Sequence, residues 1–200
     1  MKTKNENRPV KGSHTTVDPI RDIEDVRNIK KALKKKKNKR DYLLFVMGIN
    51  NGLRIGDLLS IKVGDVAGLK VGETFGIREQ KTKKPNLVMV NQDVYDAIQM
   101  YLTDDITEED KVEYLFKSRK GGVIKREAVA KMIKGWTAGM KGKYSTHSLR
   151  KTWGYHQRIN FGTGIEIIME RFNHSTPAVT KRYLGIENKE VVAVLHNCVG

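Results

Sequence analysis

A dozen consecutive residues, 40–51, are rich enough in apolar side chains to require burial: Tyr42, Leu43, Leu44, Phe45, Val46, Met47 and Ile49. Their number and composition predict a buried helix. Gly52 follows directly, and glycine is the residue most often found where a helix ends. The chain then turns into a second helix, predicted over 56–61, with Asp57 in the first turn, where a carboxylate favours the helix dipole. The fold must therefore pack other elements around residues 40–51.

Helical spacing of apolar residues recurs along most of the remaining chain. It predicts further helices over residues 21–37, 93–102, 125–140, 147–160, 165–172 and 187–195. Thr146 is the expected N-cap of the helix at 147–160. Thr176 followed by Pro177 predicts one more helix start, and Gly185 predicts its end.

Three short segments have the composition of extended chain: residues 62–66, 74–80 and 86–90. The last two are joined by a polar turn and predict an antiparallel hairpin with a lysine-rich tip. We therefore expect a mainly α fold with a small three-stranded antiparallel β-sheet, which is an α+β arrangement.

The chain length of 200 residues fits one domain with a short appendage. Residues 1–19 are mostly polar, with lysines and an arginine among them, which predicts a flexible basic lead. Residues 20–200 are expected to form the domain.

The charge balance is strongly basic, with 38 Lys and Arg against 23 Asp and Glu, a net charge of +15. Such a surplus is expected of a protein that binds a polyanion; a basic protein without such a partner is the alternative. The single cysteine, Cys198, cannot form an internal disulfide, and no zinc-ligand pattern is present. The sequence has neither a signal segment nor an apolar run long enough to span a membrane, so we expect a cytoplasmic protein.

The chain also contains the side chains needed to attack a phosphodiester without a metal ion. Such an attack adds charge to the nonbridging phosphate oxygens, which fixed cations must stabilise. Arginine suits this role because its planar fork binds two phosphate oxygens. A tyrosine can be the nucleophile, and a lysine or histidine can protonate the leaving oxygen. The candidates are Arg54, His147, Arg150, His174 and Tyr183, each of which, taken alone, could instead be an ordinary structural residue.

These residues lie in motifs that resemble those of the tyrosine recombinases, the phage integrase family. The motifs are GLRIGD (52–57), THSLR (146–150) and HSTPAVTKRY (174–183), and QKTK (80–83) is similar to the family's lysine hairpin. A His-x-x-Arg pair alone is a weak signal, but the four elements occur in the family's order. With the surrounding helices, the resemblance covers the chain from Asp18 to its C-terminus and implies the catalytic-domain fold of that family.

The resemblance implies a role for each matching residue. Arg54 and Arg150 would hold the scissile phosphate, and His147 would assist as a general acid/base or as a phosphate donor. Lys81 would protonate the departing 5′-hydroxyl, although the neighbouring Lys83 and Lys84 are alternatives for this role.

For the remaining motif residues the implied roles centre on the nucleophile. His174 would bind the phosphate or orient the nucleophile, and Tyr183 would attack to give a 3′-phosphotyrosyl intermediate. Asp57 matches the acidic position that supports the first arginine. Neither a metal ion nor any other cofactor is implied.

Duplex DNA, bound in a basic cleft, is the implied partner. The candidate contacts are Lys83, Lys84, Arg119, Lys125, Arg126, Lys151, Lys181 and Arg182. The helix that carries Lys125 and Arg126 also has lysines at 131 and 134, and a solvated helix face explains this pattern equally well.

The chain departs from the family pattern in two respects. Asn173 stands where the family usually has glycine, but asparagine tolerates the left-handed conformation. Family members usually carry an N-terminal helical domain that clamps the DNA, which residues 1–19 cannot supply. The chain is therefore either a catalytic domain of a longer protein or a minimal recombinase.

We expect a site-specific recombinase that integrates or excises a mobile element. In the family, four protomers exchange strands on two DNA sites, so we expect a homotetramer on DNA, a monomer away from it, and association with the nucleoid. Residues 187–195 would pack either on a neighbouring protomer or on their own domain. The rival functions are a type IB topoisomerase, a DNA-binding accessory protein without catalysis and, less favoured, a metal-dependent nuclease.

Overall fold

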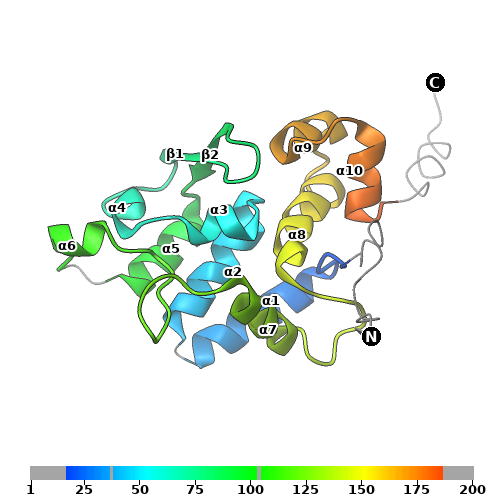
Figure 1. The fold of residues 1–200 in the computed structure, drawn as a ribbon. Helices are drawn as coiled ribbons and strands as arrows, with labels where there is room; N and C mark the ends of the chain where they lie inside the picture. Colours follow the sequence, from blue (N-terminus) through cyan, green and yellow to red (C-terminus); the bar gives the residue numbers. More distant parts are fainter. Residues whose placement is uncertain (1–16, 37, 103–104, 187–200) are drawn as a thin grey trace, which may run out of the picture.

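The computed structural model describes residues 17–36, 38–102 and 105–186 (Figure 1). In chain order the elements are α1 (Ile23–Lys35), α2 (Lys39–Asn51), α3 (Ile55–Leu59), α4 (Val63–Val66), β1 (Thr74–Arg78), β2 (Pro85–Met89), α5 (Gln92–Tyr101), α6 (Glu108–Lys111), α7 (Arg126–Trp136), α8 (Thr146–Ile159), α9 (Ile165–Phe172) and α10 (Pro177–Leu184). The mainly helical fold is confirmed. The predicted helix at 187–195, and residues 1–16 of the predicted lead, lie outside the described residues.

The predicted buried helix, α2, occupies the centre of the larger hydrophobic core. Its residues from Leu43 to Met47 are fully buried, and α1, α5 and α8 pack against it (Figure 1). Gly52 ends α2 in the left-handed conformation, with φ of 59°, and a side chain there would collide with the Trp153 ring. The glycine therefore lets α8 approach the end of α2 closely.

The sheet has two strands rather than the predicted three within the described residues. β1 and β2 pair antiparallel, in a register from Thr74 opposite Met89 to Arg78 opposite Pro85. The segment predicted as a third strand, 62–66, instead forms the short helix α4. The Asp65 carboxylate accepts a hydrogen bond from the Lys62 amide at 2.8 Å, which fixes a helical turn. Val63 and Val66, three residues apart, are then both buried, as helical spacing allows.

Helix α8 connects the larger core to a smaller one beneath α9 and α10. In Figure 1 these three helices lie together on one side of the ribbon. The smaller core contains Ile165, Ile168, Phe172, Leu184 and Ile186. The N-cap of α8 is Ser145 rather than the predicted Thr146, because the Ser148 hydroxyl accepts from the Ser145 amide at 3.0 Å and turns the helix there.

Two local predictions for α9 and α10 are confirmed. Asn173 ends α9 in the left-handed conformation, with φ of 53°. The Thr176 side chain accepts from the Val179 amide, and Pro177 is the first residue of α10. No helix in the described ranges is long and apolar enough to cross a membrane.

Gly154 is where α8 approaches the smaller core most closely. A Cβ atom there would lie 2.7 Å from the Phe172 ring and 2.8 Å from Leu184. We expect Gly154→Ala to destabilise the protein by about 1–3 kcal/mol through overpacking, although alanine normally favours a helix. Gly135→Ala on α7 is the matched control, because nothing beyond its chain neighbours and its own helix backbone lies within 4 Å of the added methyl group. Urea unfolding measures both; equal stability of the two variants would contradict this packing.

Candidate active site

Two predicted arginines meet at the end of α9. Arg54 is the N-cap residue of α3, and its Nη2 donates to the backbone oxygen of Phe172 over 3.3 Å. Arg150, in α8, is only 2% exposed. Its Nη1 donates to the Gly52 oxygen at 2.6 Å, and its Nη2 donates to the same Phe172 oxygen at 2.9 Å. The two guanidinium groups therefore share one acceptor.

The acceptors are carbonyl groups at helix C-termini. Phe172 is the last residue of α9 and Gly52 follows the last residue of α2, where carbonyls lack partners within the helix. Arg171 fills a third such position, donating to the Asn51 oxygen at 3.1 and 2.6 Å. A cation is favoured there because the C-terminal end of a helix carries partial negative charge. Two helix ends thus hold three arginines in place.

Burial lowers the pKa of Arg150 to about 10, an effect that Tyr183 opposes and the charge of Arg54 reinforces. The guanidinium therefore remains charged at neutral pH. Its carbon also lies 4.3 Å from the centre of the Phe172 ring, a cation–π contact.

Tyr183, on α10, presents its hydroxyl group to His147. The Tyr183 oxygen and His147 Nδ1 are 3.2 Å apart. The tyrosine ring packs edge-on against Phe172 and His174, with ring centres 5.4 and 5.0 Å away. Burial raises the pKa of Tyr183, and the charges of Arg150 and Arg54 only partly oppose this. The phenol is therefore protonated at neutral pH and needs a base before it can act as a nucleophile.

His147 is suited to accept that proton. Loss of water around part of the ring lowers its pKa below the usual 6.5, and the charges of Arg150 and Lys151 lower it further. The ring is thus neutral at pH 7. In the tautomer protonated at Nε2, Nδ1 can accept a hydrogen bond from the Tyr183 hydroxyl.

His174 lies in the short connection between α9 and α10. Its Nδ1 is 3.1 Å from the hydroxyl of the buried Thr180. Burial lowers the pKa of His174 to about 4, with Arg150 and Arg54 contributing. At neutral pH this residue can therefore offer one ring N–H to an anion without carrying a charge.

Asp57, which was expected to support Arg54, faces the β1–β2 hairpin instead. Its Oδ1 accepts from the Gln80 amide at 2.8 Å, and its Oδ2 is buried without a hydrogen-bond partner among the described residues. The carboxylate that pairs with Arg54 is Glu79, at 2.6 Å. Asp57 thus binds the chain just past β1, and a supporting role for it toward Arg54 stays a prediction.

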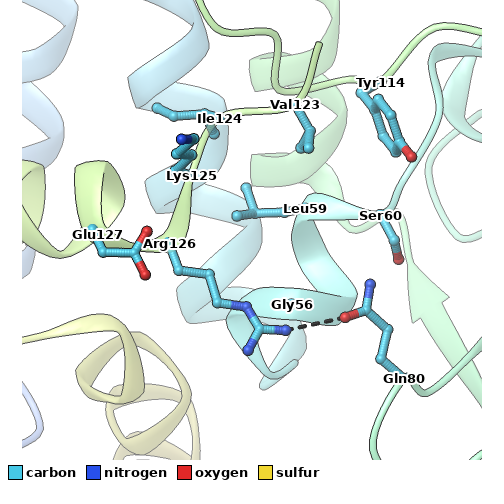
Figure 2. Close-up of a pocket in the computed structure, with 10 residues that line it drawn as sticks. All are labelled: Gly56, Leu59, Ser60, Gln80, Tyr114, Val123, Ile124, Lys125, Arg126 and Glu127. Carbon is cyan, nitrogen blue, oxygen red and sulfur yellow. Dashed lines mark hydrogen bonds between the residues drawn. The ribbon is translucent and has the colours of Figure 1, made fainter.

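A pocket of about 380 Å³ opens beside α3, with Arg126 and Gln80 on its lining (Figure 2). It is lined by Gly56, Leu59, Ser60, Gln80, Tyr114, Val123, Ile124, Lys125, Arg126 and Glu127. Arg126 donates to the Gln80 side chain at 3.1 Å, which joins the start of α7 to the residue before Lys81. None of the lining residues belongs to the cluster of arginines, histidines and Tyr183.

The three lysines of the hairpin turn are exposed and differ in their contacts. Lys84 donates to the Asn173 side chain at 3.1 Å. Lys83 adopts φ of 60°, and its backbone oxygen accepts from Arg78 at 2.8 Å. The Lys81 ammonium has no hydrogen bond or ion pair with any described residue, although its charge contributes to the lowered pKa of His147. Among the described residues, the ammonium groups of Lys81 and Lys83 are therefore both without a partner, whereas that of Lys84 is bonded.

The remaining basic candidates are spread over several elements. Arg119 is exposed on the loop before α7, Lys125 and Arg126 are exposed at its start, and Arg182 is exposed on α10 beside the half-buried Lys181. Lys151 is buried, whereas a residue that contacts DNA is expected at the surface. It is 6% exposed, and its ammonium lies 4.7 Å from the centre of the Tyr183 ring. Its helix turns it inward, next to the nucleophile candidate.

Sequence reasoning missed Glu79, Arg171 and Phe172. Glu79 is fully buried and pairs with Arg54. Phe172 supplies the oxygen shared by Arg54 and Arg150. The position of Phe172 before the helix-ending Asn173 is a signal for an unpartnered carbonyl, but no sequence pattern indicates which arginines bind it.

This arrangement can hold an anion and activate an oxygen nucleophile. The guanidinium groups, one buried and one partly exposed, can attract a phosphate, and the adjacent phenol has a neutral imidazole that can serve as a base. The described residues contain no group of three or more His, Cys, Asp and Glu side chains arranged to hold a metal ion.

Comparisons with known proteins define the class to which this chain belongs. The phage integrase family matches residues 22–190. The "Probable integrase/recombinase YoeC" of Bacillus subtilis (strain 168) is 39% identical over 176 residues, which are 86% of this chain and 91% of the relative. A "Tyrosine recombinase" of Pseudothermotoga lettingae is 28% identical over 77% of this chain, and the match spans about half, 52%, of that relative.

Solved structures share the fold. The XerA recombinase superposes with a TM-score of 0.71 at 21% identity, covering 91% of this chain and 67% of that one. The catalytic domain of bacteriophage HP1 integrase gives a TM-score of 0.55 at 18% identity, over 90% and 95% of the two chains. The class is that of the tyrosine recombinases. The chain belongs to the phage integrase family, as its motifs predicted, and site-specific DNA recombination is its function.

Proposed function

We propose that this chain cleaves and rejoins duplex DNA at specific sites through a covalent 3′-phosphotyrosyl intermediate on Tyr183. The observation that carries the proposal is the 3.2 Å contact between the Tyr183 hydroxyl and His147 Nδ1, beside the buried Arg150. The residues proposed as nucleophile, base and fixed cation thus lie together, which supports a phosphoryl transfer.

In the proposed cleavage step, the Tyr183 oxygen attacks the scissile phosphorus while its proton passes to His147 Nδ1. The new bond joins phosphorus to the tyrosine oxygen, and the bond from phosphorus to the 5′-oxygen breaks. The departing 5′-oxygen takes a proton from a lysine ammonium of the hairpin turn. Rejoining is the reverse step, with a 5′-hydroxyl as the nucleophile. One phosphate ester bond replaces another in each step, so no outside source of energy is needed.

Arg54 and Arg150 are proposed to bind the nonbridging phosphate oxygens. Each guanidinium has five N–H groups, and the hydrogen bonds to Glu79, Phe172 and Gly52 use two of them in each arginine. His174 would add a neutral donor next to the Tyr183 ring. Because these groups are held before DNA binds, little reorganisation opposes the reaction.

Lys81 is the preferred general acid, since its ammonium is not held by another described residue while Lys84 is bonded to Asn173. Removing a general acid typically costs about 10²–10⁴-fold in rate. Lys83 remains an alternative, because it is exposed on the same turn.

The proposed partner is double-stranded DNA, with four protomers on two sites, and the proposed task is integration or excision of a mobile element. The net charge of +15 supports double-stranded DNA as the partner. Structures named as XerH bound to difH substrate and as Tn1549 transposon integrase with transposon-end DNA support this choice of partner. This chain covers 53% of the XerH chain, and the arrangement of four protomers on two DNA sites is therefore proposed for it.

The cleavage rate is expected to hold a plateau around pH 7 and to fall only below the ordinary histidine pKa of 6.5. His147 must be neutral to accept the tyrosine proton, and its lowered pKa keeps it neutral down to more acidic pH. Single-turnover cleavage rates across pH 5–8 measure this profile. An acidic limb with its midpoint above 6.5, or one unchanged in His147→Asn, would count against His147 as the base.

The proposed function is tested first with a pool of nicked duplexes whose central segment is randomised. Covalent protein–DNA complexes are recovered under denaturing conditions and sequenced to obtain a selected site. Exchange between two DNA molecules carrying that site is then measured in EDTA, beside relaxation of a supercoiled plasmid. We expect exchange to proceed in EDTA. Plasmid relaxation without strand exchange would favour the type IB topoisomerase. Absence of a covalent complex would favour the accessory protein, and loss of activity in EDTA would favour the metal-dependent nuclease.

A further inference from the structure

Glu79 is a fully buried carboxylate between the two parts of the proposed site. It follows β1 directly and lies two residues before Lys81. Its oxygens accept from Arg54 at 2.6 Å, the Thr82 hydroxyl at 2.5 Å, the Asn86 side chain at 3.0 Å and the Asn173 side chain at 3.4 Å. These donors come from the N-cap of α3, from within the lysine turn, from β2 and from the end of α9.

Such a carboxylate is tolerated only because it is so well bonded. Burial raises the pKa of Glu79, but hydrogen bonds from Thr82 and Asn86 and the charge of Arg54 lower it by more, so the net pKa lies below the ordinary value. Glu79 is therefore ionised when Arg54 binds it. Its backbone also closes the turn, accepting from the Lys83 amide and donating to the Lys84 oxygen, both at 2.9 Å.

A carboxylate bound to a phosphate-binding arginine could occupy the place of the phosphate until DNA binds and displaces it. The surroundings of Glu79 argue against this. Three of its four donors belong to residues other than Arg54, and no part of Glu79 reaches solvent. The carboxylate therefore stays in place and orients Arg54, whose side chain remains 20% exposed.

We propose that Glu79 is a positioning residue that fixes Arg54 and the Lys81 turn as one unit. Phosphate binding and leaving-group protonation are then aligned by a single buried anion. The inference rests on the proposed function, since it assumes that Arg54 and Lys81 act on the same phosphate. It assigns Glu79 no contact with DNA.

Replacing the bridging 5′-oxygen of the selected site by sulfur separates the two parts of this role. A thiolate leaves without protonation, because thiols are far more acidic than alcohols. A defect in placing Lys81 should therefore be restored by the sulfur substrate, whereas a defect in placing Arg54 should persist. Thr82→Val removes the hydroxyl donor of the lysine turn and leaves the Arg54–Glu79 pair intact. Glu79→Gln removes the negative charge that holds both Arg54 and the lysine turn.

We expect Thr82→Val to cleave the natural duplex about tenfold more slowly than wild type and the sulfur duplex at the wild-type rate. We expect Glu79→Gln to lose about 100-fold on the natural duplex and to recover only partly on sulfur. Glu109→Gln, an exposed change on α6, should cleave both like wild type. Thermal unfolding and DNA binding of each variant show whether the folded, bound protein is being compared.

Equal losses for Glu79→Gln on both duplexes would overturn the coupling, because Glu79 would then act through Arg54 alone. Wild-type cleavage by Glu79→Gln would overturn the role altogether. Failure of the proposed function looks different, since the wild-type chain itself would then form no adduct with either duplex.

Discussion

Replacing Tyr183 by phenylalanine is expected to abolish covalent attachment to DNA, with a loss of at least ~10⁴-fold in cleavage rate. The change removes only the oxygen that lies 3.2 Å from His147. The ring keeps its edge-on packing against Phe172 and His174, so the fold and DNA binding should be retained. Loss of one hydrogen bond costs about 1 kcal/mol in stability.

The measurement is denaturing electrophoresis of the nicked selected duplex after incubation with each protein. Tyr155→Phe, on α8, is the matched control, because it removes the same atom from a residue outside the arginine cluster. An adduct that still forms with Tyr183→Phe, or one lost in Tyr155→Phe, would show that the nucleophile has been misassigned.

Replacing Arg150 by alanine is expected to impair both cleavage and folding. Cleavage should fall by about 10²–10³-fold, because a fixed donor to the developing phosphate charge is lost. The unfolding free energy should fall by about 2–4 kcal/mol, since the oxygens of Gly52 and Phe172 lose their buried donor. The pKa of about 10 shows that burying this charge is itself costly, which limits the loss of stability.

Arg150→Lys distinguishes charge from geometry. Lysine restores a cation but lacks the planar fork with which arginine can donate to two carbonyls and a phosphate at once. We therefore expect it to recover part of the stability, measured by urea unfolding, and little of the cleavage. Full recovery of cleavage by lysine would mean that Arg150 acts only as a point charge.

The sequence predicted best those elements whose causes are local. The apolar run of α2, with Gly52 after it, predicted a buried helix, and Thr176-Pro177 predicted the start of α10. Asn173 was expected to tolerate the left-handed conformation that ends α9. Each of these depends on residues within one or two turns.

One failure has a local cause that composition hides, and the others depend on contacts between distant residues. The Asp65 carboxylate and the burial of two valines make Val63–Val66 a helix, although the composition of residues 62–66 resembles a strand. Lys151 was a candidate DNA contact, but α8 buries it, with its ammonium 4.7 Å from the centre of the Tyr183 ring. Glu79 carried no motif at all, and only the folded hairpin brings it to Arg54.

The central claim is that Tyr183 becomes joined to the 3′-phosphate at the cleavage point. It is tested most directly with the selected duplex labelled at the 5′ end of its scissile strand. After denaturation the label should remain with the protein, and protease digestion with mass spectrometry should place the attached nucleotide on the peptide containing Tyr183. A label left on free DNA, or an attachment at any other residue, would contradict the account.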